Sequence, residues 1–154
     1  YATGQIPIYY NHRQSARPHQ GKYQDIPSTP LYEFAHGLSY TTYEYGELQP
    51  SAFKLKKEDK LSVSIAVTNT GNMDGLETVH WFISDPVSTI SRPVKELKHF
   101  EKQMIEKGQT KTFTFNIDPI RDLGFVNAKG EKFLEAGEYY IIVKDKKIKV
   151  EVQD

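Results

Sequence analysis

The fold is decided by the stretch LSVSIAVT at residues 61–68, in which every second side chain is aliphatic. Leu61, Val63, Ile65 and Val67 alternate with small or polar residues. On an extended backbone this period of two places the apolar side chains on one face and the others on the opposite face. The pattern predicts a half-buried antiparallel β-strand.

The same alternation recurs in four later segments, at residues 78–83, 112–117, 139–143 and 148–152. Glycine, proline, asparagine and aspartate separate the segments, which is typical of turns. These turn signals are Asn69-Thr70-Gly71-Asn72, Asp74-Gly75, Asp85-Pro86, Lys107-Gly108, Lys129-Gly130 and Ala136-Gly137. Asp145-Lys146 leaves room only for a tight hairpin between the last two strands.

Two further strands are expected near 43–48 and 94–100, which brings the total to about seven. No stretch from residue 43 onward has a helical period. The sequence therefore predicts an all-β fold, an immunoglobulin or fibronectin type III-like β-sandwich of about seven antiparallel strands. Trp81 is expected to fill the space between the two sheets.

Length and charge narrow the function classes. The 154 residues suffice for one domain with an appendage. Lys and Arg number 20, as do Asp and Glu, and this balance argues against nucleic acid as the main partner. No apolar run approaches the ~20 residues of a membrane span, so no membrane partner is expected.

The residues offer little chemistry of their own. The chain has no cysteine, which excludes disulfides and thiolate chemistry. Its five histidines, including His19, are scattered without a metal-binding spacing, and no phosphate-binding glycine motif is present. Ser39 lacks the G-x-S-x-G context of a nucleophile. We expect no catalytic residue, no metal and no cofactor.

Several charged and aromatic residues have a plain structural interpretation. Glu77, Asp85 and Glu96 are interpreted as sandwich surface charges, although paired carboxylates can perform glycosidic chemistry. His80 and His99 are expected to be solvated. Phe82 is predicted to face outward, where it either starts an apolar patch or is covered by the N-terminal segment.

The first 42 residues differ in composition from the rest of the chain. Nine of the 19 aromatic residues lie within the first 45 positions, and proline and glycine interrupt any regular period there. Disordered leaders are usually poor in aromatic residues. We therefore expect residues 1–42 to form an irregular, extended arm that lies across other protein surface.

Three stretches carry a resemblance to a known family. They are GQIPIYYNH at 4–12, PLYEFAHGLSYTTY at 30–43, and DPV at 85–87 followed by RPVKELK at 92–98. In this order and spacing they resemble the C-terminal end of family 3 glycoside hydrolases, of the β-glucosidase and β-xylosidase type. The resemblance covers essentially the whole chain.

The resemblance implies a parent enzyme with a (β/α)8 barrel that carries an aspartate nucleophile, an α/β sandwich that usually supplies the acid/base, and a fibronectin type III-like domain. Residues 43–154 resemble that last domain, and residues 1–42 resemble the tail of the α/β sandwich with its linker. Neither catalytic motif falls in this chain. The parent is expected to be a retaining β-glycosidase that acts on terminal β-glycosides in the periplasm or outside the cell.

The leading hypothesis is a non-catalytic structural module that docks on the catalytic domains of its own parent glycosidase. The residues expected to contact those domains are Tyr9, Tyr10, His12, Tyr32, Phe34, His36 and Tyr40. A carbohydrate-binding module and a protein-interaction or dimerisation domain remain as alternatives. Ala35 stands where many relatives have glycine, so its backbone is not expected to need a positive φ.

Overall fold

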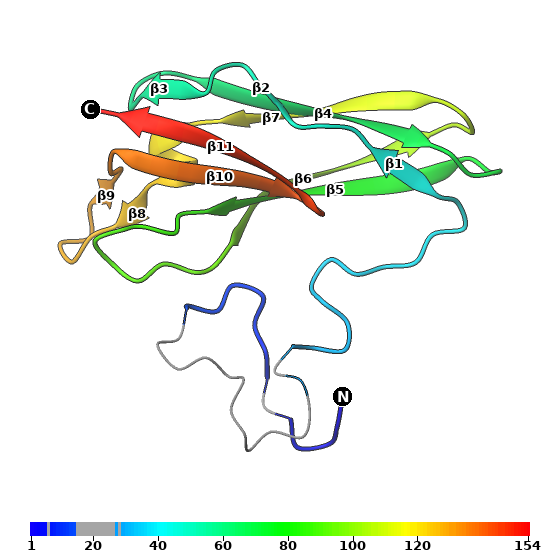
Figure 1. The fold of residues 1–154 in the computed structure, drawn as a ribbon, viewed down its shortest axis with the longest axis horizontal. Helices are drawn as coiled ribbons and strands as arrows, with labels where there is room; N and C mark the ends of the chain where they lie inside the picture. Colours follow the sequence, from blue (N-terminus) through cyan, green and yellow to red (C-terminus); the bar gives the residue numbers. More distant parts are fainter. Residues whose placement is uncertain (6, 15–26, 28) are drawn as a thin grey trace.

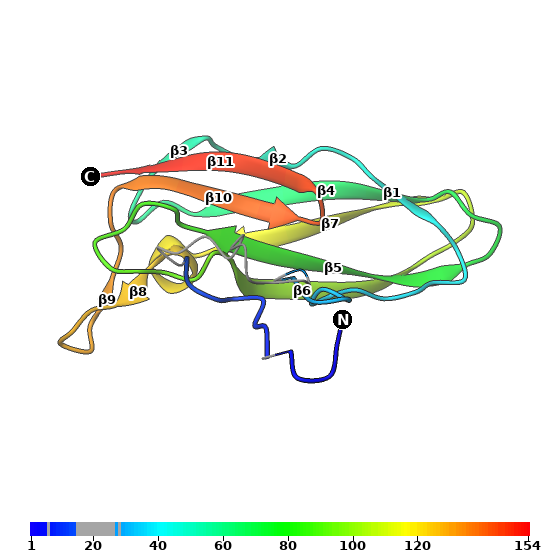
Figure 2. The ribbon, with the colours of Figure 1, turned by 60° about the horizontal axis from the view of Figure 1, so that its bottom comes forward.

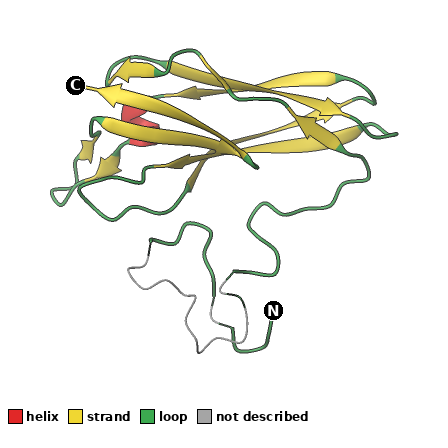
Figure 3. Cartoon of the chain, viewed as in Figure 1, coloured by secondary structure: helices red, strands yellow, loops and turns green. Residues whose placement is uncertain are grey.

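The computed structural model describes residues 1–5, 7–14, 27 and 29–154 (Figure 1). Among the described residues, regular structure begins at Tyr43 and is almost entirely β-strand, as Figure 3 shows. In chain order the elements are β1 (Tyr43–Tyr45), β2 (Gln49–Pro50), β3 (Lys54–Lys56), β4 (Leu61–Asn69), β5 (Gly75–Ser84), β6 (Glu96–Ile105), β7 (Thr110–Ile117), η1 (Pro119–Leu123), β8 (Phe125–Val126), β9 (Lys132–Phe133), β10 (Gly137–Val143) and β11 (Lys146–Gln153).

The strands form two main sheets, which are seen from two directions in Figures 1 and 2. One contains β1, β4 and β2 in that order, with β7 also paired to β4. The other has the order β3-β11-β10-β5-β6. All pairs are antiparallel except β11 with β3, and a small β8–β9 pair stands apart. The predicted all-β sandwich is confirmed.

The core lies between the sheets and uses the alternating positions that the sequence indicates. Val63, Phe113 and Ile141 are fully buried, whereas the residues immediately before and after each of them are more exposed. Trp81 is also fully buried, with its ring centroid 6.0 Å from that of Phe115 in the facing sheet. Trp81 therefore occupies the expected place at the centre of the sandwich.

The sequence prediction missed five short elements. The strands β2, β3, β8 and β9 have two or three residues each, too few to show a period. The other is η1, a single π-helical turn whose Asp118 cap accepts a hydrogen bond from Arg121 N at 2.9 Å. It buries Leu123 under the end of the sandwich.

Several strand boundaries also differ from the prediction. The sixth strand runs from Glu96 to Ile105, so it extends five residues beyond the expected end at 100. The last hairpin turns at Lys144 and Asp145, because Val143 already pairs with Lys146. Lys144 adopts a φ of 52° in this turn. Within the described ranges, no helix is long and apolar enough to cross a membrane.

Candidate docking surface

The described part of the arm is attached to the sandwich near the start of β6. Val94 N donates a hydrogen bond to the backbone oxygen of His12 at 2.9 Å, and Arg13 forms an isolated antiparallel bridge with Pro93. The Tyr10 hydroxyl accepts a bond from Leu97 N at 3.4 Å. In Figures 1 and 2 the arm follows one side of the sandwich, close to β5 and β6.

An aromatic cluster continues this attachment. The rings of Tyr10 and Phe34 stack with centroids 4.2 Å apart, and both meet the Phe82 ring edge-on, at 5.9 and 6.2 Å. Such pairs contribute about 0.5–1.5 kcal/mol each beyond the area they bury. Phe82 is only 5% exposed. Of the two alternatives left open for this outward-facing ring, coverage by the arm is therefore the observed one.

The two strand histidines are partly buried, so the expectation that both are solvated is wrong. The His80 ring lies between those of Phe82 and Phe100, at 6.5 and 6.4 Å. The His99 ring stacks on Phe115 at 5.1 Å. An aromatic face covers each imidazole, and single-strand alternation does not reveal the cover by Phe100 and Phe115, because each of these rings comes from a different strand than its histidine.

The arm segment from Leu31 to Tyr40 has every residue exposed, although it contains five large apolar or aromatic side chains. Leu38 and Tyr40 are 96% and 97% exposed, and Tyr32 is 67% exposed. The sandwich therefore contacts this segment at Phe34 and leaves Tyr32, Leu38 and Tyr40 largely uncovered.

Ala35 corrects one expectation. Its φ is +70°, in the left-handed region that costs an ordinary residue about 1–2 kcal/mol. The next residue closes a turn here, because His36 N donates to the backbone oxygen of Glu33 at 2.9 Å. The backbone thus retains the conformation that favours glycine, and the alanine is accommodated with strain.

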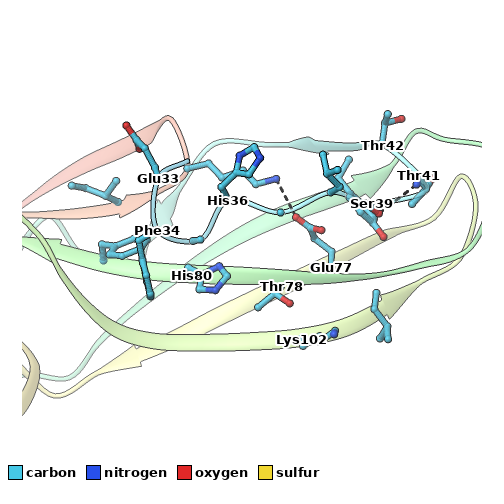
Figure 4. A pocket seen from close by; sticks show the side chains of 18 of the residues that line it. Glu33, Phe34, His36, Ser39, Thr41, Thr42, Glu77, Thr78, His80 and Lys102 are labelled. Carbon is cyan, nitrogen blue, oxygen red and sulfur yellow. Dashed lines mark hydrogen bonds and ion pairs between the residues drawn. The ribbon is translucent and has the colours of Figure 1, made fainter. Parts of the chain in front are cut away.

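A groove of about 980 Å³ runs between the arm and the outer face of β5 and β6 (Figure 4). The arm side carries Phe34 and His36, and the strand side carries His80 and Lys102, as the close-up shows. Glu77 also lines the groove, but its Oε1 already accepts bonds from Tyr45 Oη at 2.5 Å and Lys144 Nζ at 3.0 Å. Burial, together with the bond to Glu77, raises the pKa of Tyr45.

A second cavity of about 300 Å³ lies where the two described parts of the arm meet. The predicted docking residues that line it are Tyr9, Tyr10, His12, Tyr32 and Phe34. The His12 Nδ1 atom is 3.0 Å from the backbone oxygen of Tyr9, and the His36 ring lies 5.0 Å from that of Tyr32. The structure thus brings residues far apart in the sequence into one surface.

The junction between arm and sandwich is fixed by Asn69. This side chain is fully buried, and its Oδ1 accepts bonds from Thr41 Oγ1 at 2.6 Å and Gly71 N at 3.1 Å. Its Nδ2 donates to the backbone oxygens of Met73 at 2.7 Å and Ile105 at 2.9 Å. One amide therefore joins the end of the arm to two hairpin loops.

Two glycines in the turns that follow Asn69, Gly71 and Gly75, leave room for the junction between arm and sandwich. A Cβ atom on Gly71 would overlap Thr41 Oγ1, and one on Gly75 would overlap the Tyr43 hydroxyl. The Asn69-Thr70-Gly71 and Asp74-Gly75 motifs, interpreted from the sequence as turns alone, thus also accept the arm. The residues of one motif contact a segment 28 positions away, and sequence spacing gives no sign of that contact.

A buried ion pair supports the loop to which the arm attaches. Arg92 Nη1 lies 2.9 Å from Asp85 Oδ2 and donates to the Leu123 backbone oxygen at 2.7 Å, and both charged side chains are nearly inaccessible. Burial raises the pKa of the Asp85 carboxyl against the opposing effect of Arg92. The interpretation of Asp85 as a surface charge is therefore wrong. Glu135 accepts bonds from Ser88 and Thr89 in the same loop.

Among the residues that the structure describes, no group of three or more His, Cys, Asp or Glu side chains is arranged to hold a metal ion. His19 lies outside the described residues.

Comparison with known proteins matches part of the chain to a domain family and most of it to longer proteins. Residues 77–147 match the fibronectin type III-like domain family. The chain is 35% identical to a periplasmic β-glucosidase of Salmonella typhimurium and 37% identical to a putative β-xylosidase of Formosa agariphila, in each case over 92% of its length. It spans 20% and 18% of those two proteins, so it matches about one fifth of their length.

Solved structures give the same answer. A β-glucosidase from Erythrobacter marinus superposes with a TM-score of 0.86 at 32% identity, over 97% of this chain and 20% of that one. A β-glucosidase from Listeria innocua, solved in complex with laminaribiose, gives 0.85 at 35% identity, over 98% and 22%. The chain contains a fibronectin type III-like domain and is similar to about one fifth of these β-glucosidases and β-xylosidases.

The arm brings most of the residues predicted for docking together beside the fibronectin type III-like domain, with differing exposure. Tyr9 and Tyr32 are exposed, Phe34 is 48% exposed, and Tyr10 is partly buried against Phe82. Tyr40 stands apart from both cavities with its ring free. Leu31 and Leu38 belong to the same exposed surface but are not among the residues predicted for docking. Their position within the 30–43 stretch is the sequence signal that could have identified them.

Proposed function

We propose that the chain is the non-catalytic C-terminal fibronectin type III-like domain of a family 3 glycoside hydrolase that hydrolyses terminal β-glycosides, and that it docks on the catalytic domains of the same protein. Residues 1–42 form the linker and the tail of the preceding α/β sandwich, and residues 43–154 form the docking module. The docking residues are Tyr9, Tyr10, His12, Tyr32, Phe34, His36 and Tyr40.

The exposed segment from Leu31 to Tyr40 carries this proposal. Single exposed apolar residues are ordinary on a protein surface, but a contiguous group marks an interaction site. Covering one leucine side chain contributes about 1.5–3 kcal/mol, so Leu38 and the neighbouring rings supply a substantial driving force for docking. The relatives are about five times as long as this chain, and a parent protein of that length has room for a partner surface outside the chain.

The chemistry of the groove supports a non-catalytic role. A retaining glycosidase places two carboxyl groups ~5 Å apart across the scissile bond, one of them free to attack. Glu77 is committed to Tyr45 and Lys144, and the Glu33 side chain points away from β5 and β6 in Figure 4. The parent enzyme, with its catalytic domains, is proposed to act in the periplasm or outside the cell, as one relative does by name.

The direct test is association in trans. The chain and the remainder of the parent enzyme are expressed separately and mixed, and binding is measured by calorimetry. Tyr40→Ala and Leu38→Ala are expected to weaken binding at least tenfold each. Phe53→Ala, which removes a ring of 60% exposure from the far edge of the sandwich, is the control and leaves binding unchanged. Equal affinity for all three variants and the wild type would refute the assignment of this surface.

Enzymatic assay supplies an independent test. The purified chain is expected to release no nitrophenol from nitrophenyl β-glucoside or β-xyloside, whereas the complete enzyme does. Turnover by the chain alone that survives Glu33→Gln and Glu77→Gln would point to a contaminant, and turnover abolished by either substitution would overturn the non-catalytic role.

A further inference from the structure

Docking through the arm leaves unexplained an apolar stripe that continues from the arm along β5 and β6. Leu76 pairs across the strands with Met104, and His80 pairs with Phe100. Leu76, Met104 and Phe100 are 51%, 46% and 63% exposed. We call this surface, formed by Leu76, Thr78, His80, Phe100, Lys102 and Met104, the outer β5–β6 face.

The outer β5–β6 face is continuous with the covered part of the arm attachment. His80 borders Phe100 at one side and Phe82 and Phe34 at the other, with centroid distances between 6.4 and 6.5 Å. The arm therefore covers one end of a single aromatic surface and leaves the other end open. Leu76 and Lys102 line the same 980 Å³ groove as Phe34 and His36.

The charged residues of this surface indicate which kind of partner surface can cover it. Lys102 pairs with Thr78 across the strands and stands between Phe100 and Met104. Within the described part of the chain it makes no ion pair, and neither does Lys95, whose ammonium lies 5.0 Å from the Phe82 ring centre. The groove's third lysine, Lys144, is already bound to Glu77.

A cover over this face removes water from the Lys102 ammonium. Burying an unpaired charge is costly, whereas a charge that meets an opposite partner retains most of its interaction. A purely apolar cover is therefore disfavoured, and a second basic surface is excluded by repulsion. An acidic group flanked by apolar side chains satisfies both the ammonium and the neighbouring rings.

We propose that the catalytic body of the parent enzyme covers the outer β5–β6 face as well as the arm, and that it places an Asp or Glu carboxylate against Lys102. This inference rests on the proposed docking function and adds the outer β5–β6 face to the surface that docks. The partner surface is thus apolar with at least one carboxylate, matched to Phe100 and Met104 on either side of Lys102.

Oxidative footprinting of the complete enzyme and of the isolated chain tests the coverage. Phe100 and Phe53 have similar exposure, 63% and 60%, so hydroxyl radicals modify them at similar rates in the isolated chain. In the complete enzyme we expect Phe100 and Met104 to react at least fivefold more slowly, with Phe53 unchanged. Equal rates for Phe100 in the two proteins overturn the inference.

The same measurement separates this inference from the proposed function. Tyr40 and Tyr32 report on the arm. If they are protected while Phe100 is not, the arm docks and the outer β5–β6 face is free. If the arm tyrosines and Phe100 all react as in the isolated chain, both proposals fail.

Charge substitutions test the carboxylate. Lys102→Glu is expected to abolish most of the protection of Phe100, while Lys102→Met retains it because the apolar contact remains. Lys111→Glu, at an exposed lysine of β7 in the other sheet, is the matched control and leaves protection intact. Unchanged thermal unfolding of the isolated variants establishes that each one folds. Full protection in Lys102→Glu would overturn the acidic partner.

Discussion

Replacing the buried amide of Asn69 with a carboxyl group is the most informative perturbation of the junction between arm and sandwich. Asn69→Asp preserves the size of the side chain and the Oδ1 acceptor used by Thr41 and Gly71. It removes both hydrogen bonds that Nδ2 donates, to the backbone oxygens of Met73 and Ile105. At neutral pH it also directs a carboxylate oxygen at those two carbonyl groups.

The magnitude follows from the contacts. Two lost hydrogen bonds are worth about 0.5–1.5 kcal/mol each, and a buried carbonyl left without a partner adds about 1–3 kcal/mol. Asn69 is fully buried, so water does not compensate. We expect a loss of about 2–6 kcal/mol in the free energy of unfolding at pH 7, a large part of the 5–15 kcal/mol typical of a domain.

The pH dependence of the stability of Asn69→Asp provides a second test of this reasoning. Burial beside carbonyl oxygens raises the pKa of the introduced aspartate above its unfolded value of about 3.9. The folded variant therefore binds a proton more readily than the unfolded one, and stability increases as pH falls through the raised folded pKa. The neutral carboxyl then donates to one carbonyl and restores part of the loss.

The single tryptophan makes the assay direct. Trp81 is buried in the core, so its fluorescence follows urea unfolding of the chain at several pH values. Asn72→Asp, an exposed position in the same turn, is the control and should change stability by less than about 0.5 kcal/mol. Wild-type stability of Asn69→Asp at pH 7, or a deficit that does not shrink on acidification, would refute the reasoning.

Two further substitutions address the arm and the loop that holds it. Ala35→Gly is expected to stabilise the turn by up to about 1 kcal/mol, because glycine adopts a φ of +70° without the alanine's strain; slower hydrogen exchange at His36 N measures it. Arg92→Leu leaves the Asp85 charge buried and unpaired, so we expect a loss of about 3–5 kcal/mol in urea unfolding. Adding Asp85→Asn to that variant should recover part of the loss, and a double variant no more stable than Arg92→Leu alone would contradict the pairing argument.

The sequence predicts the sandwich well because each long strand carries its own period. Val63 and Ile141 can be assigned to the core without knowing the partner strand, because alternation within the strand already identifies the buried face. The short strands and η1 lack any period, and β2 and β3 are defined by their pairing with β4 and β11. The burial of Asp85 depends on Arg92 and on the end of η1, which is a tertiary arrangement.

The candidate site was predictable only in part, for a related reason. The density of tyrosine and proline marks the arm as a contact segment, but composition does not say which rings the sandwich itself covers. The structure assigns Tyr10 to the attachment and leaves Tyr40 free. The outer β5–β6 face was missed because Leu76 and Met104 belong to different strands and become neighbours only through the strand register.

Attachment of the arm at two points has an energetic consequence for docking. A flexible chain must lose about 1–2 kcal/mol of backbone entropy for each residue that it orders on binding. Here the Tyr10–Phe34–Phe82 cluster holds one end of the exposed segment and the Thr41–Asn69 bond holds the other. Much of that cost is therefore met when the domain folds, so the exposed rings of the arm meet their partner surface as a preorganised element.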